Sequence, residues 1–161
     1  MQPLWLLDSI GSRLIIDEQQ AFSDLSISSF GNYFLQLGIW GRSNTFTHKT
    51  HIKNCFLIAT HPFGEINLVA DLGRLPLQDK TIDVIFLPHT LEQYNNHQDI
   101  LSASTNAINE SGTLTIEPGV LIKFDSEKAF QVKGTLIAIG TSNSKITFTS
   151  NLSNPVAGDW D

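Results

Sequence analysis

The sequence predicts an α/β fold, in which an open, mostly parallel sheet is followed by a short β-rich tail. Four apolar runs occur between residues 33 and 88, segments of helical periodicity lie on both sides of them, and a Gly-Thr-Leu triplet repeats after residue 111. Near-continuous apolar runs are typical of strands covered on both faces, and strands separated by helices or loops favour a parallel sheet. The chain therefore changes character near Ser111.

The predicted elements of the first region follow from periodicity. Residues 12–25 place apolar side chains at near-helical spacing among Asp, Glu and Gln, which predicts an amphipathic helix. A second helix is predicted between residues 97 and 109. The four apolar runs predict strands at residues 33–37, 54–60, 66–70 and 82–88.

Three loops are predicted to meet where ligands bind in such sheets, beyond the carboxyl ends of the strands. The first, Gly38–Ser43, carries two glycines that let the backbone approach a ligand closely. The second contains Asp71, which can hydrogen-bond a ligand or cap a turn. The third carries an imidazole and a carboxylate, on His89 and Glu92. Each loop taken alone is also typical of an ordinary strand exit.

The order of these segments resembles the class I S-adenosylmethionine-dependent methyltransferases, in particular the small bacterial branch of the type 11 group. The segments that carry the resemblance are Leu35–Gly41, Ala70–Leu77 and Ile82–Glu92, and it covers roughly residues 4–116. It implies a Rossmann-like sheet that binds S-adenosylmethionine and transfers the sulfonium methyl group to an acceptor, which the sequence does not identify. Such chemistry needs mainly proximity and alignment, because the methyl donor is already activated.

The resemblance also implies a role for each loop. The glycine loop would line the methionine and ribose of the donor, the Asp71 loop would lie beside the adenine, and Pro88, His89 and Glu92 would border the acceptor's entrance. The implied donor-binding residues are Leu37, Gly38, Trp40, Gly41, Thr60, Asp71, Leu72 and Pro88. His89 is the candidate catalytic residue, which would accept a proton from the acceptor; the alternative is that it only packs and hydrogen-bonds within its loop.

Two departures from the family stand out. Thr60 occupies the end of the second strand, where the family places an acidic residue that holds the ribose hydroxyls. The further strands that follow the family's fifth strand are replaced by the β-rich tail. We expect both departures to weaken donor binding and turnover.

Residues 112–161 resemble the opening of bacterial right-handed parallel β-helix proteins. Their short alternating runs are separated by glycines, which is typical of strands joined by tight turns. Gly112–Leu114 recurs as Gly134–Leu136, and Ile122–Phe124 is echoed by Ile146–Phe148, 22 and 24 residues further on. A period of this length is that of one solenoid coil.

The predicted division places a methyltransferase-like domain at residues 1–111 and a β-helix-like fragment at residues 117–161. Residues 112–116 fit both patterns and are predicted to be a shared fifth strand. We expect this strand to complete the sheet and the remainder to pack loosely, because about three repeats are needed to bury a continuous core. The alternative functions are a non-enzymatic structural or adhesive module and an accidental gene fusion without activity.

Composition excludes several other classes of function. The formal net charge of −6 argues against binding to nucleic-acid phosphates. Apolar runs stay short of the roughly 18–20 residues of a membrane helix, and the first residues lack the features of a signal peptide. We therefore expect a cytoplasmic protein. The histidines at 48, 51 and 61 lack the paired spacing of zinc ligands, even with Cys55, so no metal is predicted.

Overall fold

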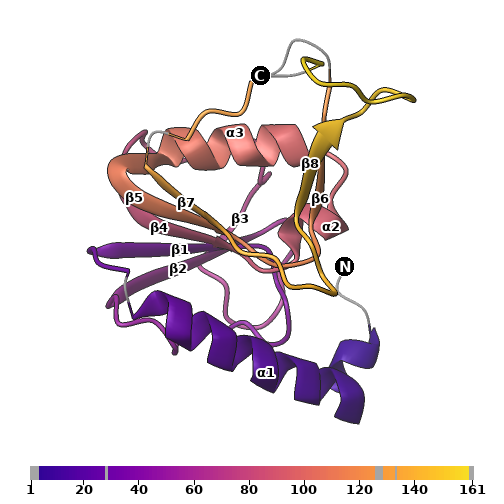
Figure 1. The fold of residues 1–161 in the computed structure, drawn as a ribbon. Helices are drawn as coiled ribbons and strands as arrows, with labels where there is room; N and C mark the ends of the chain where they lie inside the picture. Colours follow the sequence, from indigo (N-terminus) through magenta and orange to yellow (C-terminus); the bar gives the residue numbers. More distant parts are fainter. Residues whose placement is uncertain (1–3, 28, 126–128, 133, 160–161) are drawn as a thin grey trace.

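The computed structural model describes residues 4–27, 29–125, 129–132 and 134–159. A six-stranded sheet lies between one long helix on one face and a second helix on the other (Figure 1). The elements are η1 Leu4–Leu7, α1 Ser9–Ser26, β1 Tyr33–Leu37, β2 Asn54–Ala59, β3 Leu68–Val69, β4 Ile82–Leu87, α2 Thr90–Gln93, α3 His97–Ala107, β5 Ile108–Ile116, β6 Leu121–Phe124, β7 Thr135–Ala138 and β8 Thr147–Ser150. Among the described helices, none has the length and apolar character needed to cross a membrane.

The sheet has the order β3-β2-β1-β4-β5-β7, and its strand pairs are parallel. The predicted α/β class with a mostly parallel sheet is therefore confirmed. The four predicted strands form, although the third shrinks to Leu68–Val69. The order reverses at β1, because Phe34 pairs with Cys55 of β2 on one side and with Val84 of β4 on the other. The carboxyl ends of β1 and β4 thus border the topological switch point.

Helix α1 is capped at its start and covers one face of the sheet. The Asp8 carboxylate accepts hydrogen bonds from the backbone amides of Ile10 and Gly11, at 2.9 and 3.0 Å, so the helix begins three residues before the predicted position. Phe22 on its buried side packs against Phe34, Phe46 and Phe86, with ring centroids 5.8, 5.6 and 4.4 Å away. These rings form the core on this face.

The opposite face carries the larger core, which joins the two regions of the chain. Leu35, Ile85 and Leu114 from the sheet pack there with residues of α3. Ile122 and Phe124 of β6 belong to the same cluster and are 0% and 2% exposed. The expectation that the chain packs loosely after residue 116 is therefore wrong for β6, because its alternate side chains complete this core.

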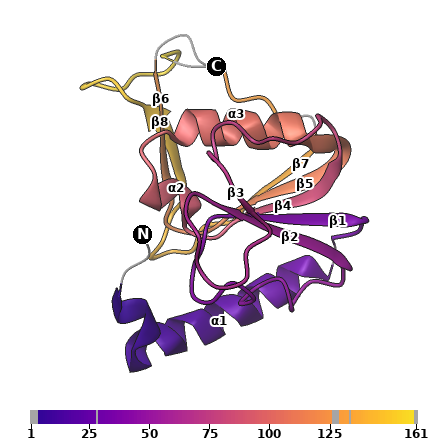
Figure 2. The same ribbon diagram turned by 180° about the vertical axis from the view of Figure 1, so that it is seen from behind.

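The C-terminal strands stack in two parallel pairs. β7 pairs with β5, with Thr113 opposite Thr135, so this pair matches the 22-residue repeat in the sequence. β8 pairs with β6, with Ile122 opposite Phe148. The observed offset of 26 residues differs by two from the 24-residue echo in the sequence, and a shift of two residues keeps the same side-chain face. This second pair stands beside α2 and the start of α3 (Figures 1 and 2).

Candidate functional site

A group of polar side chains lies around His89, which follows Pro88 at the exit of β4. Its Nδ1 lies 2.7 Å from Oε2 of Glu92, and its Nε2 lies 3.0 Å from Oε1 of Glu18 and 3.1 Å from Oε2 of Glu117. These four residues are called the His89 cluster below. Its carboxylates come from α1, from α2 and from the turn after β5, so both regions of the chain contribute to it.

The backbone and a neighbouring indole hold the imidazole in place. His89 has a left-handed backbone conformation, with φ 48°, at the start of α2. The next residue, Thr90, donates its hydroxyl hydrogen to the Leu37 carbonyl oxygen and so ties the exit of β4 to the exit of β1. The Trp40 ring stacks on the imidazole at a centroid distance of 4.1 Å, and its Nε1–H donates to Glu18 at 2.7 Å. A cationic imidazole on an indole face is a favourable arrangement.

The cluster holds His89 in its charged form. Burial alone would lower the pKa of His89, but hydrogen bonds to Glu117, Glu18 and Glu92 outweigh burial and raise it to about 11. Burial also raises the pKa of Glu117, and the nearby positive charge of His89 offsets part of that effect. An imidazolium has no free lone pair with which to accept a proton. The geometry thus favours the alternative in which His89 packs and hydrogen-bonds within its loop.

The same residues include a possible set of metal ligands. Across the described residues, the one group of three or more that could hold a metal ion is Glu18, His89 and Glu117, whose ligand atoms lie within 4.8 Å of one another. A histidine must be deprotonated to coordinate a metal. Because the carboxylates stabilise the imidazolium of His89, a metal ion would have to displace its proton, and the ion-paired cluster is the favoured arrangement.

Several of the implied donor-binding residues come together at the switch point. Leu37, Gly38 and Trp40 follow or end β1, while Pro88 follows β4. Gly38 has a φ of 84°, and a Cβ there would meet the Thr90 Oγ1 at 2.7 Å, so only glycine fits this turn. Trp40, in the loop after β1, and His89, in the loop after β4, stack their rings against each other and so bring the two loops into contact.

The remaining implied residues have local partners. The Thr60 hydroxyl lies 3.0 Å from His61 Nδ1 and 3.0 Å from the Tyr94 hydroxyl. Asp71 accepts a hydrogen bond from the Gly73 amide at 2.9 Å. It therefore caps a turn, which was the alternative to hydrogen-bonding a ligand. Leu72 is 1% exposed and belongs to the core beneath α3.

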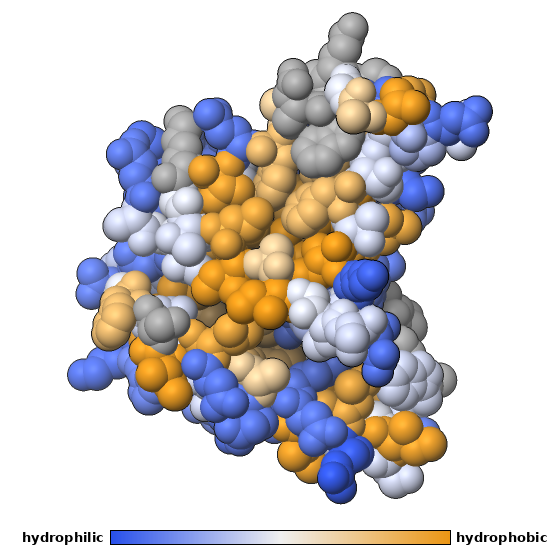
Figure 3. All heavy atoms as spheres, viewed as in Figure 1, coloured by the Kyte–Doolittle hydropathy of each residue, from blue (hydrophilic) through white to orange (hydrophobic). Residues whose placement is uncertain are grey.

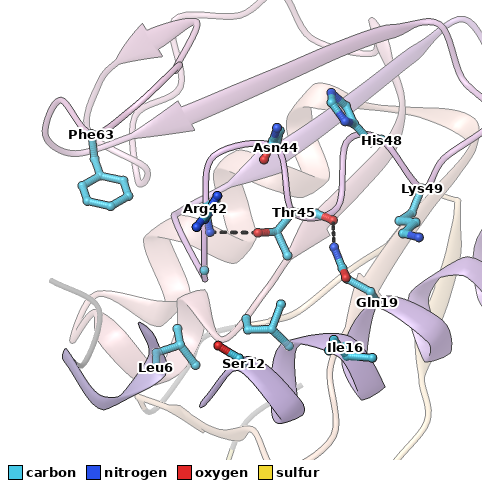
Figure 4. Close-up of a pocket in the computed structure, with 12 residues that line it drawn as sticks. Leu6, Ser12, Ile16, Gln19, Arg42, Asn44, Thr45, His48, Lys49 and Phe63 are labelled. Carbon is cyan, nitrogen blue, oxygen red and sulfur yellow. Dashed lines mark hydrogen bonds between the residues drawn. The ribbon is translucent and has the colours of Figure 1, made fainter. Parts of the chain in front are cut away.

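A cavity of about 710 Å³ lies between α1 and the loop that follows Gly41 (Figure 4). Two hydrogen bonds of Thr45 fix the loop in the cavity wall. Its backbone oxygen accepts from Gln19 Nε2 at 2.6 Å, and its hydroxyl accepts from the Arg42 amide at 2.8 Å. Phe63, which follows β2, also lines the cavity. Of the eight implied donor-binding residues, Gly41 alone is part of this lining.

Comparisons of the chain with models of protein families, with curated proteins and with solved structures found no match. The arrangement of the loops and cavities is therefore the basis on which a function can be proposed.

Proposed function

We propose that the chain is an S-adenosylmethionine-dependent methyltransferase-like domain that binds its donor at the carboxyl ends of β1 and β2. The observation that carries the proposal is the 710 Å³ cavity beside Gly41, at the exit of β1 in a parallel sheet whose order reverses at that strand. In sheets of this kind, ligands bind outside the carboxyl ends of the strands at the reversal.

The lining of this cavity suits the parts of the donor. Arg42 and Lys49 supply positive charge for the carboxylate of the methionine portion. Phe63 is 41% exposed and offers an aromatic face for the adenine. Gly41, with a φ of 75°, allows the turn that forms this side of the cavity, because a Cβ there would meet Thr45 Oγ1 at 2.8 Å and Ile15 Cδ1 at 2.9 Å.

The chemical demand on the protein is small. In methyl transfer the carbon–sulfur bond breaks as the acceptor's lone pair forms the new bond, and a neutral thioether leaves. The fold must therefore align donor and acceptor rather than supply a nucleophile. The proton lost by an acceptor would pass to solvent, because His89 is held as an imidazolium.

Isothermal titration calorimetry with S-adenosylmethionine and S-adenosylhomocysteine tests the proposal on the intact chain. We expect both to bind, and Phe63→Ala to weaken binding about tenfold through loss of stacking on the adenine. Phe30→Ala is the matched control, since Phe30 is 84% exposed and is not part of the cavity lining. The absence of both binding heat and thermal stabilisation by either compound contradicts donor binding.

A further inference from the structure

A second cavity, of about 560 Å³, lies between α1 and strands β5 and β7. We call it the α1–β7 groove. Figure 3 shows hydrophobic residues gathered over the middle of this face of the molecule, above the mixed surface of α1. The apolar residues that line the groove are Leu14, Ala21, Phe22 and Leu25 from α1, with Phe86, Ile116, Pro118, Ile137 and Ile139 from the rest of the chain.

The groove exists because this part of the sheet has no helix over it. α1 packs on β1 and β4 through Phe22, as described above. Thr115 and Ile137 are paired across β5 and β7 on the same face, and Ile137 remains only half-buried. Ile139, just beyond β7, is 59% exposed. An apolar surface of this kind, hollowed and lined by polar groups at its edge, is typical of a binding site.

The charges that line the groove are almost all negative. Glu18 and Glu117 lie at one end in the His89 cluster, and Asp17 and Asp24 lie along α1. Asp17 is paired with Arg13 at 3.7 Å, on the exposed surface. The one basic residue in the lining is His89, and the lining contains neither lysine nor arginine. The lining thus contains four carboxylates, one of them paired with Arg13, and a single imidazole, which leaves an excess of negative charge.

We propose that the α1–β7 groove binds a small organic cation, an ammonium group attached to an apolar chain or ring. The cationic group would lie near Glu18 and Glu117, and the apolar part would lie against Phe22 and Ile137. The volume falls within the range of about 300–1,000 Å³ that is usual for small-molecule sites. The inference does not rest on donor binding, because none of the eight implied donor-binding residues lines this groove.

Calorimetry with octylammonium, below its micelle concentration and without S-adenosylmethionine, tests the proposal. Octanoate and tetramethylammonium are the comparison probes, the first with the same chain and opposite charge, the second with the charge and no chain. We expect octylammonium to bind at least about tenfold more tightly than either. Lengthening the chain should tighten binding about threefold to fourfold for each added methylene group.

Two helix variants locate the site. Ala21 is exposed and lines the groove, so Ala21→Phe should fill it and weaken octylammonium binding at least about tenfold. Ile10→Phe adds the same ring at an exposed position of α1 outside the groove lining and should leave binding unchanged. Thermal melts monitored by circular dichroism show whether each variant is folded.

A charge variant supplies a readout that does not depend on filling the groove. Glu18→Gln removes one of the two carboxylates beside which the ammonium group would lie, keeps a side chain of the same size, and should weaken octylammonium binding while leaving octanol binding unchanged. The proposal is overturned if octanoate binds as tightly as octylammonium. It is also overturned if Ala21→Phe and Glu18→Gln, both folded, bind octylammonium as the parent does.

Discussion

The two faces of the six-stranded sheet are closed to different extents. On the α3 face, the helix and β6 together cover the neighbouring strands β1, β4 and β5. Side chains such as Leu114 and Ile122 are inaccessible to solvent there. On the α1 face, the helix covers β1 and β4, while Ile137 of β7 stays half-buried. When a strand is added to a sheet without a crossover helix, as β7 is here, no new helix packs over that strand. The open half of the α1 face is the consequence.

The largest expected effect is a loss of stability when the core on the closed α3 face is disrupted. Ile122→Ala removes a fully buried side chain of β6 and should lower the free energy of unfolding by about 2–5 kcal/mol, measured by urea denaturation. Leu121→Ala is the control, because Leu121 lies on the same strand and is 47% exposed; its cost should stay within about 0.5 kcal/mol. Equal, small costs for the two variants would mean that β6 does not belong to the core.

The next effect concerns the His89 cluster, at one end of the open face. The pKa of His89 is raised from 6.5 to about 11, so the folded protein binds a proton there that the unfolded chain releases above pH 6.5. Its stabilisation is complete below pH 6.5 and is lost as the pH rises toward about 11. Between pH 6.5 and about 8.5 the free energy of unfolding should fall by on the order of 2 kcal/mol.

Urea denaturation across that pH range measures the effect. His89→Gln should flatten the dependence of unfolding free energy on pH, because it removes the titrating group. His48→Gln removes an exposed histidine outside the cluster and should keep the slope of the parent. A parent protein whose stability rises over this range would contradict the charged state assigned to His89.

A smaller effect tests how firmly α1 covers its half of the face. Asp8→Ala removes the side chain that caps the helix through Ile10 and Gly11 and should cost about 1 kcal/mol. Asp8→Asn keeps a capping oxygen and should cost less. Thermal unfolding followed by circular dichroism compares the two; no loss of stability in Asp8→Ala would mean that the cap does not stabilise α1, and an equal loss in both would assign the effect to the charge of Asp8 rather than to its hydrogen bonds.

The smallest effect is expected in the open half. Ile137→Ala shortens a half-buried side chain of β7 and should cost at most about 1 kcal/mol by urea denaturation. The difference between the stability losses of Ile137→Ala and Ile122→Ala directly compares the two faces of the sheet. A cost as large as that of Ile122→Ala would show that something covers Ile137 in solution.

The periodicity of the sequence was sufficient to predict most of the sheet. Runs such as Tyr33–Leu37 and Ile82–Leu87 are mostly apolar, with one polar residue each, because both faces of a central strand are covered. The pairing of β5 with β7 follows from a true 22-residue repeat. The loose packing expected after residue 116 was wrong for β6, because a repeat count ignores the core on the α3 face: β6 packs on α3 rather than on further coils.

The candidate site was predicted only in part, because its partners are far apart in the chain. His89 was a candidate, but Glu18 and Glu117 were not, and they meet it from 71 and 28 positions away. Glu18 did carry a signal, since it interrupts the apolar stripe formed by Leu14, Ala21 and Leu25. Glu117 carried a weaker one, as the first residue after a strand. Neither signal indicates that these residues lie beside His89 in the folded protein.

The position of β5 in the sheet has a consequence for synthesis on the ribosome. β4 is hydrogen-bonded to β1 on one side and to β5 on the other, and the β5 pairing extends to Ile116. Until that residue has left the ribosomal tunnel, the nascent chain holds four strands of the sheet, and one edge of β4 is unpaired. An unpaired apolar edge of this kind attracts other chains. The interval between the emergence of β4 and that of β5 is thus the period in which a chaperone would protect this protein most.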